Sequence, residues 1–174
     1  MMTKEELVNL LLNDTEAFND ALKGEDADLS ETDFSGCSIE GAVFVNADLT
    51  SSSFADSQLT DVKFDNCDLS SVDFTRSKLV ECTFSESVLN GSDFSYANVN
   101  YCSFPDSDLA GAIIREADLS NSDLTMSENL NACIFDDTTV WPDSEYLPND
   151  FDSSYSDDLS SLKDEDDEYG SGDY

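Results

Sequence analysis

The sequence contains no histidine, and only 7 of its 174 residues are lysine or arginine. It therefore lacks the side chain that most often serves as a general base or as a neutral metal ligand. Its 5 cysteines form no C-x-x-C pair, and no glycine-rich phosphate loop is present. We expect no enzymatic activity, no catalytic residue, no cofactor and no bound metal.

Long apolar runs and a basic leader are also missing. No stretch approaches the ~20 apolar residues that a membrane-spanning helix requires. The segment from Met1 to Glu6 lacks the basic region and the apolar run of a secretory signal. We expect a cytoplasmic protein that does not enter a membrane.

Acidic residues, in contrast, are abundant. There are 40 aspartates and glutamates, and the formal net charge is −33. Such a charge repels nucleic acid and anionic membranes and favours fast, salt-sensitive association with basic surfaces. The expected partner is a protein with a basic surface, which includes DNA-binding enzymes, and no direct nucleic-acid binding is expected. The sequence is compatible with a homodimer but does not indicate one.

A repeat of five residues runs through the middle of the chain. Large apolar side chains recur at every fifth position from Leu29 to Leu124, and the residue two places before each of them is small. Neither a helix, with its period of 3.6, nor a strand, with its period of 2, produces this pattern. The chain must turn a corner every five residues, with one large and one small side chain pointing inward on each side.

Ala27-Asp28-Leu29-Ser30-Glu31 and Ala117-Asp118-Leu119-Ser120-Asn121 resemble the A-(D/N)-L-x-x unit of the pentapeptide-repeat family. The resemblance covers roughly residues 27–134. It implies an all-β solenoid, a right-handed quadrilateral β-helix with four pentapeptides per coil and about five coils. The register places four of the cysteines at small inward positions, where a reduced thiol acts as a small hydrophobe: Cys37, Cys67, Cys82 and Cys102.

Both ends depart from the repeat. Residues 1–25 are expected to form a helical cap, because Thr3 and Glu6 make a capping box, Asp14-Thr15 starts a second helix and Gly24 ends it. The β-helix with its closing segment is expected over 26–142. After Asn129, we expect Ala132-Cys133-Ile134 to restore the register. The segment from Asp136 to Pro142 resembles the ending of cyanobacterial family members, in which the tryptophan, here Trp141, covers the last coil.

Residues 143–174 are expected to form a disordered acidic tail, because they are rich in charge and poor in apolar side chains. The tail contains a block of like charges: Asp164, Glu165, Asp166, Asp167 and Glu168.

Four pentapeptides per coil stack every twentieth residue on one face. Two neighbouring faces then carry outward carboxylates, and these are our candidate partner-binding residues together with the 164–168 block: Asp28, Asp48, Asp68 and Asp108 on one face, and Asp33, Asp73 and Asp93 on the next. Two explanations are compatible with each other. In the first, the aspartates accept backbone hydrogen bonds at the corners, as turn residues do. In the second, the columns imitate a polyanion.

Three functional hypotheses follow. The first is a non-enzymatic, acidic protein-interaction module or scaffold. The second comes from the resemblance, because some family members imitate DNA, bind type II topoisomerases such as gyrase and confer quinolone resistance. The third attributes the acidic surface to a halophilic cytosol, without a specific partner.

Overall fold

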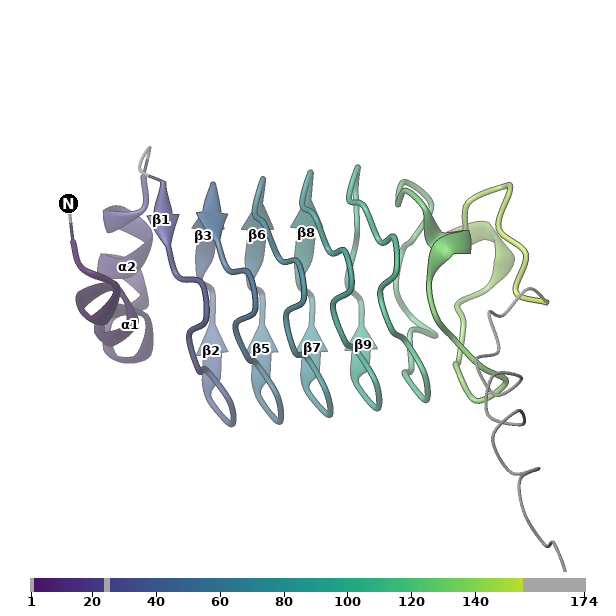
Figure 1. Ribbon diagram of the computed structural model, residues 1–174, viewed down its shortest axis with the longest axis horizontal. Helices are drawn as coiled ribbons and strands as arrows, with labels where there is room; N and C mark the ends of the chain where they lie inside the picture. Colours follow the sequence, from purple (N-terminus) through teal and green to yellow (C-terminus); the bar gives the residue numbers. More distant parts are fainter. Residues whose placement is uncertain (1, 24–25, 155–174) are drawn as a thin grey trace, which may run out of the picture.

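The computed structural model describes residues 2–23 and 26–154, which form a β-solenoid closed at its N-terminal end by two helices (Figure 1). The helices are α1 (Lys4–Asn13) and α2 (Thr15–Ala21). No helix in these residues is long and apolar enough to cross a membrane. The expected fold class, a right-handed quadrilateral β-helix with a helical cap, is confirmed.

Short parallel strands stack along the solenoid in three ladders, and Figure 1 shows the two longer ones as rows of arrows. Each strand pairs with the strand twenty residues further on, as Leu59 does with Leu79. The ladders are β1 (Ala27–Asp28) with β4 (Ala47–Asp48); β2 (Ser38–Glu40), β5 (Gln58–Thr60), β7 (Lys78–Val80) and β9 (Asn98–Asn100); and β3 (Val43–Val45), β6 (Lys63–Asp65) and β8 (Thr83–Ser85). Isolated parallel bridges continue the same twenty-residue register on the remaining sides, for example between Asp73 and Asp93.

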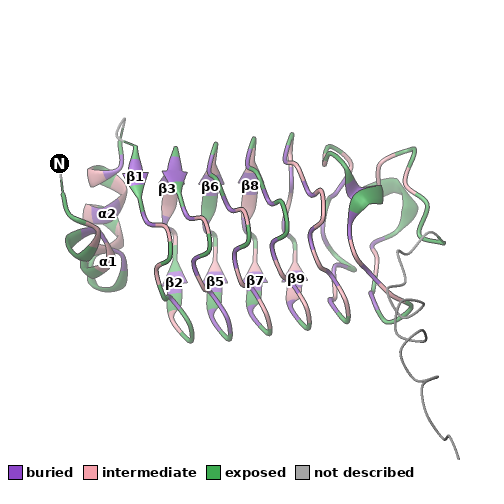
Figure 2. Ribbon diagram, viewed as in Figure 1, coloured by how far each residue is buried: buried purple, intermediate pink, exposed green. Residues whose placement is uncertain are grey.

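The core is the stack of inward side chains that the period of five predicts. Leu49, Phe54, Leu59 and Phe64 are fully buried within one coil. Phenylalanines on the same side stack face to face, with ring centroids 5.0 Å apart for Phe64 and Phe84. Figure 2 shows the burial alternating along every side of the coil. This packed interior leaves the outward positions as the surface that meets other molecules.

The corners are made by left-handed backbone. From Glu31 to Glu116, every fifth residue has a positive φ, and most of these residues are not glycine. Asn46 and Asn66 suit this conformation, whereas Tyr96 (φ 62°) and Tyr101 (φ 54°) do not, since a larger side chain is strained there. The corner positions form four edges along the solenoid, and their side chains point outward.

The N-terminal cap forms as the sequence predicts. The Thr3 hydroxyl accepts the Glu6 N–H at 3.2 Å, and Oε2 of Glu6 accepts the Thr3 N–H at 2.8 Å. Asp14 caps α2 by accepting the N–H of Ala17. Phe18 is fully buried, and its ring lies 5.1 Å from that of Phe44. The expected helix end at Gly24 lies outside the described residues.

The C-terminal end differs from the sequence prediction in its register. Ile113 bridges Ile134, which is one residue beyond the twenty-residue repeat, and Asp118 bridges Val140, which is two residues beyond it. The prediction that Ile134 takes the inward position is therefore wrong: Cys133 and Phe135 are buried, and Ile134 is half-buried. The extra residue is absorbed by the 3-10 turn η1 (Leu130–Ala132), which follows Asn129 in left-handed backbone and buries Leu130.

The ordered structure also continues past the expected boundary at residue 142. A second 3-10 turn, η2 (Ser144–Tyr146), follows, and Leu147 and Phe151 pack against the core. The rings of Trp141 and Phe151 lie 4.6 Å apart. Residues 143–154 are thus part of the closing layer and not of a tail, because their few apolar side chains cover the exposed top of the last coil.

Candidate partner-binding faces

The first acidic face is a single column of outward residues, which we name the Asp28 column. Parallel bridges connect its members one coil at a time: Asp28, Asp48, Asp68, Val88, Asp108 and Glu128. The structure therefore brings together all four aspartates predicted for this face. Glu128 extends the column by one further carboxylate, which the sequence analysis missed because it did not follow the register beyond Asp108.

The second acidic face is the Asp33 column, which follows the next side of the solenoid. Its members are Asp33, Ser53, Asp73, Asp93, Ile113 and Ile134. The three predicted aspartates are again in register, and the column ends in two apolar residues. The remaining candidates, Asp164 to Glu168, lie outside the described residues.

Every aspartate of both columns has the same local role. One oxygen, Oδ1, accepts the backbone N–H of the residue two places further on, at 3.0 Å in Asp68, 2.8 Å in Asp73 and 3.0 Å in Asp108. This is the Asx-turn hydrogen bond, which fixes the backbone just before the corner. The need for a turn hydrogen bond at each corner therefore accounts for aspartate at these positions, which agrees with the first of the two explanations given above.

Turn chemistry leaves the second oxygen unused. Every hydrogen bond to these seven carboxylates within residues 2–23 and 26–154 ends on Oδ1, including those from the hydroxyls of Ser30, Thr50 and Ser70. Hydrogen bonds from the Ser30 hydroxyl and N–H lower the pKa of Asp28, and those from Ser35 lower the pKa of Asp33. Oδ2 of each column aspartate thus has no hydrogen-bond partner among the described residues.

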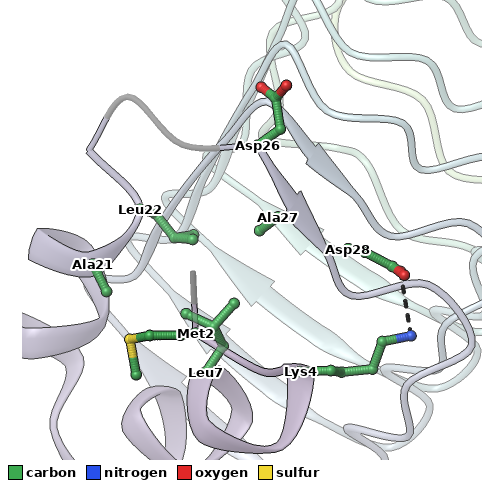
Figure 3. A pocket seen from close by; sticks show the side chains of 8 residues that line it. All are labelled: Met2, Lys4, Leu7, Ala21, Leu22, Asp26, Ala27 and Asp28. Carbon is green, nitrogen blue, oxygen red and sulfur yellow. Dashed lines mark ion pairs between the residues drawn. The ribbon is translucent and has the colours of Figure 1, made fainter.

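Few cations lie near these columns. Nζ of Lys4, in the helical cap, lies 3.2 Å from Oδ1 of Asp28 (Figure 3) and donates to the Ser30 carbonyl at 2.6 Å. Among the described residues, no other ion pair involves either column, since the remaining two are Lys23 with Asp20 and Arg76 with Asp56. Apart from Asp28, the column aspartates of the described residues therefore form no ion pair.

At the equivalent outward position, the other two faces are nearly neutral. Lys63 and Lys78 are exposed on β6 and β7, next to uncharged outward residues. At the edge between the Asp33 face and the β5–β7 face, the Arg76 guanidinium makes two hydrogen bonds of 2.8 Å to the Asp56 carboxylate. This contact lowers the pKa of Asp56. The charge at this outward position is therefore distributed unevenly among the four faces, as the sequence predicts.

No described feature offers an enclosed site for chemistry. The cleft in Figure 3 lies between the cap and the first coil; it is open to solvent and is lined by apolar side chains such as Met2 and Leu7, with Lys4 and Asp28 at its rim. Within the described residues, no group of three or more acidic or cysteine side chains is arranged to hold a metal ion. Burial raises the pKa of Cys67 and of Cys133 to about 12, which keeps both thiols protonated.

The comparisons agree with this architecture. The family model for the pentapeptide repeat region matches residues 24–94 and 57–140, and the chain belongs to this family. No curated protein sequence matches the chain.

Several solved structures are similar. They include a trypsin-treated variant of QnrB1, described as a plasmid-mediated fluoroquinolone resistance protein, with 14% identity, a TM-score of 0.48 and coverage of 63% of this chain and 65% of that one. A pentapeptide repeat protein (Rfr23) from the cyanobacterium Cyanothece 51142 is 22% identical, with a TM-score of 0.37 and coverage of 60% and 64%. One from the thylakoid lumen of Arabidopsis thaliana is 26% identical, with a TM-score of 0.34 and coverage of 52% and 67%. The chain thus spans just under two thirds of the length of the first two.

Proposed function

We propose that this protein is a non-enzymatic interaction module whose Asp28 and Asp33 columns bind a basic surface of a protein partner in the cytoplasm. The observation that carries the proposal is that Oδ2 of each column aspartate, on a regularly spaced scaffold, has no hydrogen-bond partner among the described residues. The Asx turns hold each carboxylate in a fixed position, so little side-chain entropy is lost when a lysine or arginine binds. The phenylalanine stack beneath the Asp33 column keeps neighbouring coils in register.

The proposal is tested with variants that remove charge and keep the turn. Asn in place of Asp supplies the same Oδ1 acceptor, so Asp48→Asn with Asp68→Asn neutralises two charges without removing the corner hydrogen bonds. The matched control is Asp118→Asn with Asp123→Asn, because both of these aspartates make the same turn bond on the other two faces. Each chain is used to capture partners from the source cell at low and at moderate salt.

We expect the column variant to lose the partner at a lower salt concentration than the control variant, because fewer charges attract it. Equal retention by the two variants would place binding elsewhere. A chain ending at Ser154 tests the contribution of the acidic tail. This end point lies beyond the expected boundary at residue 142, because Leu147 and Phe151 pack against the core.

A second candidate, imitation of DNA toward a type II topoisomerase, is favoured by the regular one-coil spacing of the column carboxylates. With one carboxylate per coil and ~4.8 Å per coil, two complete columns would carry a charge every ~2.4 Å, against ~1.7 Å for duplex DNA. The columns are broken at Ser53, Val88 and Ile113, which reduces this density. Inhibition of gyrase supercoiling by the purified protein would support this candidate, and its absence would remove it.

The halophilic explanation predicts a different behaviour in the absence of any partner. A surface selected only for high salt should make the isolated protein unfold when salt is withdrawn, because its carboxylates then repel one another unscreened. An interaction module should stay folded at low salt. Thermal unfolding measured from low to molar salt separates the two.

A further inference from the structure

The two acidic columns are interrupted in successive coils, since Val88 lies in the coil of Asp93 and Ile113 in the next coil, that of Asp108. Val88 breaks the Asp28 column between Asp68 and Asp108, and Ile113 ends the Asp33 column above Asp93. Val88 has 37% of its surface exposed although an aspartate occupies the equivalent position in the coils directly below and above it. Apolar outward side chains run diagonally across the edge, from Val88 in one coil to Ile113 in the next and Ile134 above it, with Asp93 and Asp108 beside them. We name this surface the apolar break: Val88, Ala110, Ile113 and Ile134.

The edge between the two acidic faces carries no side chain in these two coils. Gly91 and Gly111 occupy its corners, with φ of 66° and 70°. A Cβ atom at Gly91 would meet nothing closer than the Ser71 hydroxyl at 3.8 Å, and one at Gly111 nothing closer than the Gly91 nitrogen at 3.7 Å. Non-glycine residues hold the same left-handed conformation at most other corners, Ser51 and Ser71 of this edge included. Because glycine has no side chain at these two corners, nothing separates the apolar side chains of one face from those of the next.

Carboxylates surround the apolar break. Asp68 lies one coil below Val88 and Asp108 one coil above it, while Asp93 lies one coil below Ile113. Each of them uses only Oδ1 for its turn, within the described residues. An apolar centre with a charged rim is the usual arrangement of a protein–protein interface, in which the centre provides most of the affinity and the rim attracts and orients the partner.

We infer that the apolar break is the centre of the partner-binding surface and that its occupant is a cationic amphipathic segment of a protein partner. Aliphatic side chains of the segment would cover Val88 and Ile113, and its lysines or arginines would reach the rim carboxylates. A second copy of this chain does not fit, because its net charge of −33 would oppose the approach. This inference rests on the proposed function and specifies where along the columns, and by which chemistry, the partner binds.

The decisive variant restores the aspartates that the pattern lacks, Val88→Asp with Ile113→Asp. Aspartate stands at the neighbouring positions of both columns, so the new side chains can accept the N–H of Asn90 and of Arg115 in the same turn, and the fold should be kept. A purely electrostatic surface would bind a basic segment more tightly after this change. An apolar docking centre would bind it more weakly. The two ideas thus predict opposite signs.

The control adds the same charge on the opposite faces. In Asn98→Asp with Ser103→Asp, each new aspartate lies one coil below an existing one, Asp118 or Asp123. The probes are two synthetic peptides of equal length and equal lysine content, one with leucines at helical i, i+3, i+4 spacing and one with serines in their place. Binding of both peptides to the full chain is measured by calorimetry at low salt.

We expect the full chain to bind the leucine peptide at least about tenfold more tightly than the serine peptide. The Val88→Asp, Ile113→Asp chain should lose this preference, and the control chain should keep it. No preference in the unmodified chain, or a preference that survives the substitutions at Val88 and Ile113, overturns the apolar centre and leaves the acidic columns as the proposed surface. If the unmodified chain binds neither peptide, the proposed function fails as well.

Discussion

Oδ1 of Asn19, in helix α2, accepts the backbone N–H of Val43 at 2.8 Å, while Nδ2 of the same side chain donates to the carbonyl of Gly41 at 2.9 Å. The bond to Val43 replaces the one that a preceding coil would make, as the Lys63 N–H donates to the Ala42 carbonyl in the next coil. An exposed strand edge invites pairing with other chains. One side chain therefore closes part of the edge at which the solenoid begins.

We predict that Asn19→Ala lowers the free energy of unfolding by about 1–3 kcal/mol, because it leaves a backbone donor and an acceptor without partners. Urea unfolding measures the loss, and hydrogen exchange should show faster exchange of the Val43 amide. Asn13→Ala is the control, since the amide of Asn13 bonds only to Asn9 in the same exposed helix. An equal effect of both substitutions would mean that helix stability, and not the closed edge, is responsible.

The inward serines differ in a way that sequence does not reveal. The hydroxyl of Ser87 donates to the Phe64 carbonyl at 3.0 Å, whereas those of Ser52 and Ser57 are buried and have no partner among the described residues. A buried hydroxyl without a partner opposes folding. We expect Ser52→Ala and Ser57→Ala each to raise the free energy of unfolding by about 1 kcal/mol and Ser87→Ala to lower it by a similar amount. Chemical denaturation of the three variants would show opposite signs, and a uniform loss would contradict this account.

The five cysteines should react in two classes. Cys37 is half-buried, whereas Cys67, Cys82, Cys102 and Cys133 are buried, and all five are free thiols. Burial raises the pKa of Cys67 to about 12, so almost no thiolate is present near pH ~8 to attack a reagent. In the folded protein we expect a thiol reagent to modify Cys37 slowly and the others only after unfolding in urea. Mass spectrometry after brief labelling identifies the modified residues, and prompt labelling of Cys102 would show that the core opens.

The sequence predicts the repeating part of this structure well, because each period of five contains its own evidence. The alternation of Leu59 and Phe64 with small residues such as Val62 admits only one register, and the strand pairs confirm it. The same register places the seven aspartates in two columns, and the parallel bridges follow those columns coil by coil.

The sequence predicts less where the period fails. After Asn129, two registers place an apolar residue inward, Ile134 or Phe135, and only the packing of the last coil decides for Phe135. The polar composition of residues 143–154 predicts a tail. Leu147 and Phe151 nevertheless pack on the end of the solenoid, and the Asn131 side chain adds hydrogen bonds to the backbone of Asp150 and Asp152.

The contribution of the closing layer can be measured through the fluorescence of Trp141. Trp141 is half-buried between the rings of Phe135 and Phe151, with centroids 5.1 Å and 4.6 Å away. A chain that ends at Pro142 loses Leu147 and Phe151, so we expect its free energy of unfolding to fall by about 2–4 kcal/mol and the Trp141 emission to shift to the red as water reaches the indole. A chain that ends at Ser154 keeps both residues and should match the full chain in emission and stability. Both truncations remove residues 155–174, and only the one at Pro142 also removes 143–154. A loss of stability in both chains would therefore assign it to residues 155–174, whereas a loss only in the shorter chain assigns it to the closing layer.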